Sequence, residues 1–473
     1  MPATSEQYAA ATSGTAPQAS LARGYWLALA VALLLACRLA LMWWGPLADT
    51  TEARYGELAR QTAVHGYWLM PHMDAATPFF AKPPLSTWAS AASMQLLGVN
   101  EFAARLPALL AALLALWISH AYARALGLRE AGLVVPVLAA SPLFFISAGA
   151  VMTDAIQMTI VWGAQYCAWR ALADAPAQRR WRLGLWALVG LGALSKGLAT
   201  WVLIGLPIAC YALLQRDLRG VLRRLFDGAG VLLAAAICLP WYVAAQRAYP
   251  GFLQYFIIGE HFSRFLVPGW QGDRYGFAHR QPLGAIWLFW IGAALPWMHV
   301  FVARLAPAVK ARRLGGSAAE RYLWCATLTP LIFFTFSRNI IWTYALTALP
   351  PFALLVVQWL AQQDERHRLR TAQALAAFAL LALLATPFVL RQQEANSDRA
   401  LVRAFRQLAA PGSVLAYDTQ PAFSSAFYTA GALTQDTAGR KLVVLDNDTV
   451  ARRGVPPEQV LFRGGRRSLV VLP

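Results

Sequence analysis

Long apolar stretches constrain the fold of this chain more than any other feature of its sequence. Eleven runs are mostly apolar, and most of them approach the roughly 20 residues that a transmembrane helix needs. The runs are continuous and rich in Leu and Ala, which favours helices over spanning strands, whose apolar residues alternate. We therefore predict an α-helical polytopic membrane protein with about 11 transmembrane helices, at 25–45, 103–123, 131–150, 155–170, 183–195, 198–214, 228–246, 283–303, 322–337, 342–360 and 372–390.

The charge distribution predicts how the chain crosses the membrane. Only 14% of the residues are charged, against about 25% in soluble domains. With the N-terminus in the cytoplasm, the inner segments carry 19 Lys and Arg, and the longer outer segments before residue 391 carry 10. This bias indicates that orientation. The net charge of +18 then indicates contact with anionic membrane lipids and no nucleic acid, because the inner basic loops are short.

The remaining segments suggest a division into three parts. Residues 1–24 are polar and are expected to form a disordered cytoplasmic tail, and residues 25–390 a transmembrane domain. Its outer loops, 46–102 and 247–282, are too long for simple connectors, and the first contains two helical stretches expected at the membrane interface. Residues 391–473 combine a helix near 397–409 with β-type runs at 413–417, 441–446, 459–464 and 469–473. They are expected to form a small α/β domain on the outer side.

Acidic and basic residues gather where the predicted spans reach this outer side. Such residues near a bilayer are costly to bury and tend to mark functional sites. The candidates are Asp49, Glu52, Arg54, Lys82, Asp154, Lys196, Glu260, His261, Arg264 and Arg338. A carboxylate at this depth can act as a general base. Several cations can hold the phosphate of a lipid and stabilise it as a leaving group. Together they indicate sugar transfer from a polyprenyl phosphate.

Each candidate also has a structural interpretation. Lys196 or Arg338 alone can be an anchor that extends to the interface, and Asp49 can cap the helix that follows it. Glu57 and Arg60 are expected to form an ion pair on the surface of that helix. A divalent metal is possible, with Glu260 and His261 as ligands, although adjacent residues on a helix do not point the same way.

Three motifs in order, "TTEARYGELAR", "AKPPLSTW" and "GVNEFAARLP", resemble the polyprenyl-phosphate-sugar glycosyltransferases. They are most similar to the aminoarabinose transferases that act on lipid A, relatives of the protein O-mannosyltransferases. The resemblance covers roughly residues 25–360. It implies a GT-C fold, with many membrane helices, interfacial helices in the first outer loop and an outer soluble domain.

The resemblance also implies roles for individual residues. The first-loop motif of the family, acid-acid-x-Arg-Tyr, corresponds to Thr51, Glu52, Ala53, Arg54 and Tyr55. Thr51 replaces the first acid, so the base is either Asp49, two residues upstream, or Glu52. Lys82 corresponds to a lysine that contacts the lipid phosphate, and Asp154 to a second catalytic acid. Further donor-binding positions are matched by Lys196, Glu260, His261, Arg264 and Tyr344.

The sequence therefore predicts an inverting glycosyltransferase of the bacterial inner membrane, with its active site and C-terminal domain in the periplasm. The expected donor is an undecaprenyl-phosphate-linked sugar, and the acceptor is lipid A or another envelope glycolipid, with a glycan or protein as the alternative. A transporter or flippase of lipid-linked sugars is the rival from another class. It should place charges near the bilayer midplane and show related halves. The ionisable residues here gather at span ends instead, with Arg38 as the one internal exception.

Overall fold

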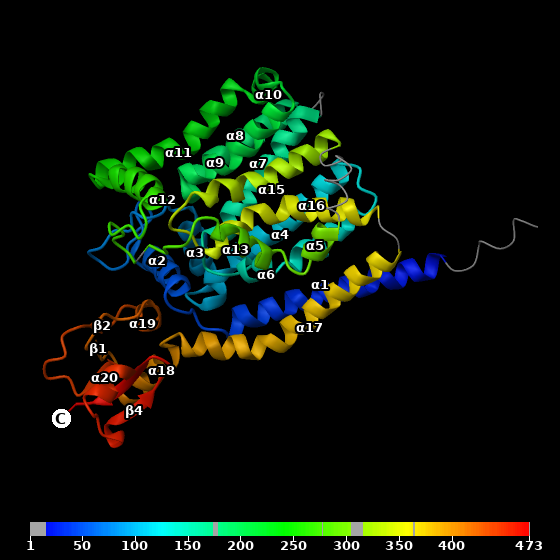
Figure 1. The fold of residues 1–473 in the computed structure, drawn as a ribbon. Helices are drawn as coiled ribbons and strands as arrows, with labels where there is room; N and C mark the ends of the chain where they lie inside the picture. Colours follow the sequence, from blue (N-terminus) through cyan, green and yellow to red (C-terminus); the bar gives the residue numbers. More distant parts are fainter. Residues whose placement is uncertain (1–15, 174–177, 277, 304–315, 363–364, 473) are drawn as a thin grey trace, which may run out of the picture.

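The computed structural model describes residues 16–173, 178–276, 278–303, 316–362 and 365–472. Its first part is a helical body (Figure 1). The helical elements, including short 3₁₀ and π segments, are α1 (Ala16–Trp44), α2 (Thr51–His65), α3 (Leu85–Leu97), α4 (Glu101–Ala125), η1 (Ala131–Leu133), α5 (Val134–Ala139), α6 (Pro142–Ser147), α7 (Asp154–Ala173), α8 (Gln178–Lys196), α9 (Leu198–Leu214), α10 (Leu218–Leu225), α11 (Gly228–Ala248), η3 (Gln254–Ser263), α12 (Arg264–Leu266), α13 (Ala285–Ala293), α15 (Ala318–Thr335), η4 (Trp342–Ala348), α16 (Leu349–Leu360) and α17 (Glu365–Ala395).

Apolar helices of membrane-spanning length confirm the predicted fold class. Within the described residues, five helices are long and apolar enough to cross a bilayer: Tyr25–Trp44, Glu101–Ala125, Gly228–Ala248, Trp342–Leu360 and Leu369–Ala395. The chain is thus a multi-pass membrane protein, and the number of eleven spans stays a prediction. Helix α1 already begins at Ala16, inside the segment expected to be a disordered tail, and residues 1–15 lie outside the described residues.

The predicted span at 131–150 is not one continuous helix. It is divided into η1, α5 and α6, with Ser141 in an extended conformation between the last two. Pro142 follows it, and a proline disfavours helical backbone at the residue before it and lacks the N–H needed inside a helix. Helix α5 therefore ends at Ala139, and a new helix, α6, begins with Pro142 in its first turn.

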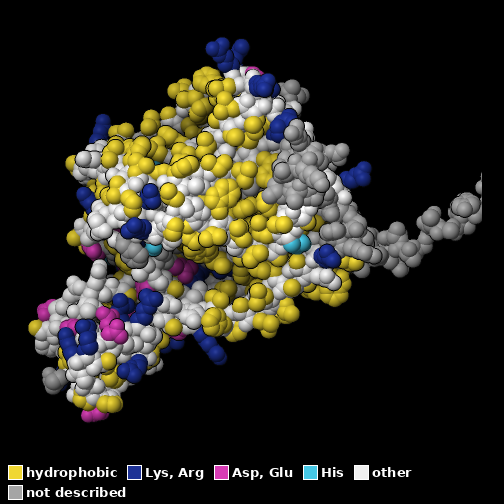
Figure 2. Space-filling model, viewed as in Figure 1, with side chains coloured by type: hydrophobic (Ala, Val, Ile, Leu, Met, Phe, Trp, Pro, Cys, Tyr) yellow, Lys and Arg dark blue, Asp and Glu magenta, His cyan; other side chains and the backbone are white. Residues whose placement is uncertain are grey.

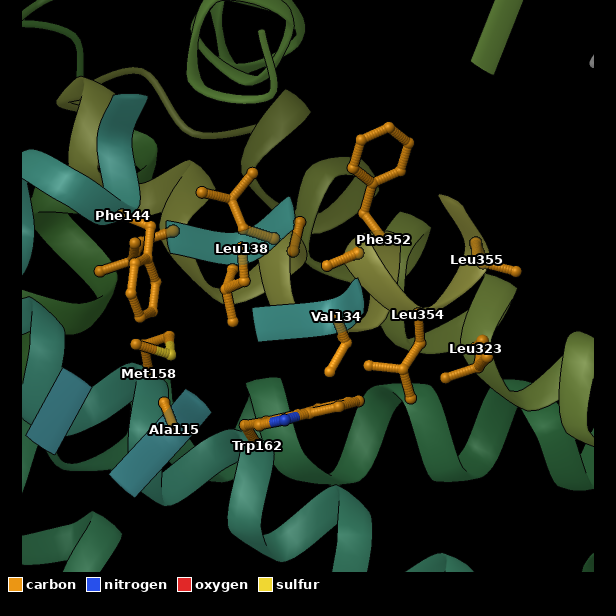
Figure 3. Close-up of a cluster of buried hydrophobic side chains, with 14 of the residues drawn as sticks. Ala115, Val134, Leu138, Phe144, Met158, Trp162, Leu323, Phe352, Leu354 and Leu355 are labelled. Carbon is orange, nitrogen blue, oxygen red and sulfur yellow. The ribbon is translucent and has the colours of Figure 1, made fainter. Parts of the chain in front are cut away.

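A buried apolar core holds the helical body together. Trp162 of α7 is 1% exposed and lies against Val134 and Leu354, which come from α5 and α16 (Figure 3). Its indole N–H donates to the Ser119 hydroxyl of α4 at 2.9 Å, as a buried polar group requires. This core makes a rigid support for the outer ends of α7 and α8, where Asp154 and Lys196 lie.

Helices α1 and α17 run side by side along one flank of the body (Figure 1). The C-terminal end of α1 leads directly to α2, and the C-terminal end of α17 leads to the C-terminal unit, residues 399–472. This pairing brings two segments more than 300 positions apart in the chain to the same end of the helical body. The C-terminal unit consequently lies beside α2.

The C-terminal unit is a small sheet with helices, as the sequence predicts. Its helices are α18 (Arg399–Leu408), α19 (Phe423–Tyr428), α20 (Asn447–Arg452) and η5 (Pro457–Gln459), and its strands are β1 (Leu415–Tyr417), β2 (Leu433–Thr434), β3 (Leu442–Asp446), β4 (Val460–Arg463) and β5 (Arg467–Val471). The strand order is β2-β1-β3-β5-β4. The β1 strand is parallel to β2 and β3, whereas β5 is antiparallel to β3 and β4. The sequence did not predict β2.

Polar contacts dock this unit onto the helical body. The Tyr428 hydroxyl accepts from the Leu47 N–H at 2.8 Å and donates to Glu101 at 3.0 Å. Arg399 pairs with Glu101 at 3.1 Å and donates to the Trp44 carbonyl at 2.9 Å. The contacts reach the end of α1 and the start of α4, so the position of the unit is tied to the first outer loop.

Candidate active site

A polar cavity of about 660 Å³ lies where the C-terminal unit meets the helical body. Charged side chains gather along this hollow, whereas apolar side chains cover much of the body (Figure 2). Eight of the residues predicted from the sequence line it: Asp49, Arg54, Tyr55, Lys82, Asp154, Lys196, Arg264 and Tyr344. Residues from both outer loops, from two span ends and from the C-terminal unit therefore share one cavity.

Three of the cations in this cavity are held by carboxylates. The Lys82 ammonium lies 2.8 Å from Glu260, and the Lys196 ammonium lies 2.8 Å from Asp154. Arg264 contacts Glu260 at 3.2 Å and Asp273 at 3.0 Å. Burial would raise the pKa of Glu260, but Lys82 and Arg264 outweigh it and hold that pKa below its ordinary value. Glu260 thus stays ionised and fixes the two cations, which belong to different outer loops.

A second, mainly apolar cavity of about 570 Å³ adjoins the first. Its wall includes apolar side chains of α9, η3 and α15, among them Val202, Phe256 and Phe333. The two cavities share Lys82, Asp154, Lys196, Arg264 and Tyr344 in their linings. The cations therefore lie at the junction of an apolar and a polar space, and the Lys196 ammonium lies 5.1 Å from the centre of the Tyr344 ring.

Asp49 lies in the wall of the polar cavity and does not cap α2. The N-cap position of α2 is Thr50, without a side-chain capping bond. The Asp49 carboxylate instead accepts from the Ser424 N–H at 3.0 Å and from the Ser424 hydroxyl. Burial raises the pKa of Asp49 above its ordinary value, against these hydrogen bonds. A carboxyl with a raised pKa is a better proton acceptor near neutral pH.

Glu52, the other predicted base, forms an ion pair with Arg105. Arg105 donates to both of its carboxylate oxygens, at 2.9 and 2.8 Å, and the Val151 N–H lies 3.3 Å from one of them. Burial would raise the pKa of Glu52, but the charges of Arg105 and Arg38 lower it below the ordinary value. Glu52 is also absent from the linings of the two cavities. Its geometry fits a structural role.

Arg54 and Tyr55 stand on the cavity side of α2. Arg54 donates to the Tyr275 carbonyl at 2.6 Å, and its guanidinium lies 5.5 Å from the centre of the Tyr55 ring. The buried Nε of Arg54 makes no hydrogen bond within the described residues. Glu57 and Arg60 do form the expected ion pair, at 2.6 Å. They are only 1% and 2% exposed, so its expected position at the surface is wrong. Helix α2 is covered by α3 and by the C-terminal unit and does not lie free at the interface.

His261 and Arg338 were also predicted as site residues, but neither lines the polar cavity. The His261 ring nitrogens lie 2.8 Å from the Phe256 carbonyl and 3.2 Å from the Lys196 carbonyl, while Glu260 turns toward Lys82. The pair does not converge on one point, and the described residues contain no group of three His, Cys, Asp or Glu side chains that could hold a metal. The side chain of Arg338 is exposed and outside the linings of both cavities.

Several cavity residues were not predicted. Asp273 and Tyr275 lie in the second outer loop, 247–282, and the density of polar and aromatic residues there could have indicated them. Asn339 follows the predicted residue Arg338. Asp446, Arg466 and Arg467 of the C-terminal unit also line the cavity, and Ser424 of the same unit binds Asp49 from outside the lining. Nothing in their local sequence shows that they approach the first outer loop, because that depends on how the unit docks.

Comparisons with known proteins identify relatives of this chain. Residues 81–243 match the family described as dolichyl-phosphate-mannose-protein mannosyltransferase. The chain is 28% identical over 371 residues to an undecaprenyl phosphate-alpha-4-amino-4-deoxy-L-arabinose arabinosyl transferase of Sodalis glossinidius, covering 76% of this chain and 64% of the relative. It is 30% identical over 358 residues to a protein of the same name from Pseudomonas fluorescens, covering 70% of this chain and 58% of the relative. The chain thus spans less than two thirds of the length of these relatives.

A solved structure matches almost the whole chain. The crystal structure of ArnT from Cupriavidus metallidurans bound to undecaprenyl phosphate has a TM-score of 0.78 and 21% sequence identity, and the match covers 94% of this chain and 97% of that one. The apo structure of the same protein matches with a TM-score of 0.77. The predicted resemblance to polyprenyl-phosphate-sugar glycosyltransferases is therefore confirmed, and this chain has the GT-C fold of ArnT.

Proposed function

We propose that this chain is an inverting glycosyltransferase that takes a sugar from a polyprenyl phosphate donor. The observation that carries the proposal is the junction of the two cavities. A lipid phosphate needs an apolar channel for its chain, cations at headgroup depth and a polar space for the attached sugar. Lys82, Lys196 and Arg264 stand where the apolar and polar cavities meet.

The proposed reaction is a single displacement at the anomeric carbon of the donor sugar. An O–H group of the acceptor attacks this carbon, the new C–O bond forms, and the bond to the phosphate oxygen breaks. The polyprenyl phosphate leaves with the bonding electron pair, and Lys82, Lys196 and Arg264 stabilise its added charge. Asp49 accepts the acceptor proton, because Glu52 is held by Arg105 outside the cavity. Attack opposite the leaving group inverts the anomeric configuration.

The substrates follow from the names of the relatives and from the size of the polar cavity. The relatives are named for undecaprenyl phosphate and aminoarabinose, so this donor is the first to test. The cavity of about 660 Å³ is large enough for one sugar and part of an acceptor headgroup. We take the acceptor to be lipid A or another envelope glycolipid, with Asp154 orienting the donor sugar or the acceptor.

We place the chain in the bacterial inner membrane, and the positive-inside bias supports an orientation with the N-terminus in the cytoplasm. In this orientation the cavities and the C-terminal unit face the periplasm, where both a lipid-linked sugar and an envelope glycolipid are accessible. Fusing a reporter enzyme that is active only in the periplasm after residue 472 tests the orientation.

The decisive experiment is sugar transfer by the purified full chain in detergent. It uses undecaprenyl phosphate-linked aminoarabinose, extracted lipid-linked hexoses and an envelope lipid extract. We expect transfer by the parent protein and at least about 100-fold less by Lys82→Ala. Arg247→Ala, which removes an exposed cation on α11, is the matched control and should retain transfer. Equal transfer by Lys82→Ala and the parent contradicts the mechanism, and tight donor binding without transfer to any acceptor points to a flippase.

A further inference from the structure

The C-terminal unit forms part of the polar cavity. Residues 419–423 and the side chains of Asp446, Arg466 and Arg467 line it together with the first outer loop. A backbone hydrogen bond links the two walls near Asp49. The Asp49 N–H donates to the carbonyl of Asn396, which lies between α17 and the C-terminal unit, at 2.8 Å. Whatever occupies the cavity is therefore enclosed by both the helical body and the C-terminal unit.

Four aspartates line this cavity, and Asp49 differs from the other three in its partners. Asp154 pairs with Lys196, Asp273 with Arg264, and Asp446 with Arg467. Within the described residues, no ion pair reaches Asp49. Its carboxylate is held by Ser424, through neutral donors. A carboxylate paired with a cation is a weak base, so Asp49 is the cavity aspartate best suited to accept a proton.

The geometry around Ser424 sets the direction of its hydroxyl proton. The Asp398 N–H donates to the Ser424 oxygen at 3.0 Å. Ser424 is fully buried, and its hydroxyl has one proton to give, which goes to Asp49. The Ser424 N–H binds the other carboxylate oxygen at 3.0 Å. Both oxygens of Asp49 are thus fixed, and their remaining lone pairs are left for the cavity.

We propose that Ser424 is a positioning residue for Asp49, so that the C-terminal unit completes the catalytic centre of the helical body. This inference rests on the proposed function. Ser424 takes no part in bond making. It holds the Asp49 carboxylate in the orientation that receives the acceptor proton while the acceptor oxygen bonds to the anomeric carbon. The leaving phosphate keeps its electron pair, and Asp49 later releases its proton to solvent.

Charged groups from the helical body and from the C-terminal unit surround Asp49. The two whose charges act on it directly are Asp398 before α18 and Arg467 at β5. The other charged side chains and the histidine that line its cavity are Arg54, Lys82, Asp154, Lys196, Arg264, Asp273, Arg274, His279, Asp446 and Arg466. Glu52 on α2 lies outside this lining. Asp398 and Arg467 form an ion pair at 3.2 Å, and Glu52 is paired with Arg105. These pairs offset much of each other's field. The hydrogen bonds from Ser424 consequently remain the main interactions that favour the charged form of Asp49.

The test compares the pH dependence of kcat/KM in the full chain and its variants. Ser424→Ala removes the hydroxyl donor and keeps the backbone donor. We expect the acidic limb to move upward by about one pH unit and kcat/KM at neutral pH to fall by about 10-fold or more. Ser424→Cys keeps a weaker donor of similar size, so its acidic limb should lie between those of the parent and Ser424→Ala. It also serves if the alanine variant does not fold.

The matched control is Tyr428→Phe, which loosens the same docking surface without contact to Asp49. It should keep the acidic limb of the parent. An unchanged limb in Ser424→Ala, or an equal shift in Tyr428→Phe, overturns the positioning role. Infrared titration of the carboxylate band that Asp49→Asn removes gives a second readout without turnover. Its midpoint should rise in Ser424→Ala even if the proposed transfer reaction fails, and an unchanged midpoint overturns the inference on its own.

Discussion

Lys82 of the first outer loop and Glu260 of the second are joined by an ion pair of 2.8 Å, and the Glu260 side chain is 2% exposed. This contact brings a residue from each loop to the junction of the two cavities. Glu260 also holds Arg264. The carboxylate therefore holds two cations that would otherwise repel each other, and both cations line the two cavities.

Glu260→Gln should accordingly weaken phosphate binding without removing a cation. The neutral amide no longer offsets the repulsion between Lys82 and Arg264, so both side chains lose their fixed positions. We expect KM for the lipid-linked donor to rise by about 10-fold and kcat to fall as well, because leaving-group stabilisation depends on placement. Steady-state kinetics with varied donor concentration measure both effects. Unchanged donor kinetics would show that Glu260 does not organise this site.

Filling the apolar cavity should block the donor chain. Val202 of α9 lines this cavity, and Val202→Trp adds bulk where the polyprenyl chain is proposed to lie. We expect the purified variant to lose most of its binding of undecaprenyl phosphate, because the lipid cannot enter. Leu232→Trp, at a side chain 71% exposed on α11, is the matched control and should leave this binding unchanged. Equal binding by both variants places the lipid elsewhere.

Asp49 should set the acidic limb of the reaction. Burial raises the pKa of Asp49 above the ordinary value of 3.8, and a base acts in its deprotonated form. Activity is therefore expected to fall as the pH drops through this raised pKa. Since a raised folded-state pKa means that ionisation of Asp49 disfavours folding, Asp49→Asn should abolish most transfer without lowering the melting temperature at neutral pH. Full transfer by this variant rules out Asp49 as the base.

The Glu52–Arg105 pair should contribute to stability and not to the chemical step. Breaking it leaves a buried cation, so Glu52→Gln should destabilise the fold by about 3 kcal/mol, measured by thermal unfolding in detergent. The folded-state pKa of Glu52 is lowered from 4.5. The contribution is therefore present above that value and is lost as the pH falls through the lowered pKa. Transfer per folded molecule should persist, and its complete loss would return Glu52 to the position of candidate base.

Arg399 should control how firmly the C-terminal unit is docked. It binds Glu101, Glu394 and the Trp44 carbonyl, so Arg399→Ala removes links to the first loop and to α17. We expect faster cleavage by a protease between Ala395 and Arg399, where the chain leaves α17, measured by the decay of the intact band. Arg403→Ala, on the same helix, is the matched control. Identical cleavage of both variants would mean that other contacts hold the unit.

The sequence by itself determined the class of fold and indicated eight of the residues that line the polar cavity. Apolar runs of spanning length require helices because a bilayer cannot hydrogen-bond an exposed backbone. Short β-type runs after residue 391, separated by turn residues, likewise predicted a sheet. Lys82, Asp154 and Lys196 were found because charges at the ends of apolar helices are costly without a function. The motif around Glu52, Arg54 and Tyr55 supplied the resemblance.

Only the tertiary structure decided which acid faces the cavity. Asp49 and Glu52 are three positions apart. Their local sequence does not show that Glu52 forms a buried ion pair or that Asp49 lines the cavity. Arg105 reaches Glu52 because α4 packs near α2, and Ser424 reaches Asp49 because α17 returns the chain to the outer end of α1. Both contacts join residues 53 or more positions apart. Hydrogen bonds act over about 3 Å, so such pairings follow from packing and cannot be predicted from neighbouring residues.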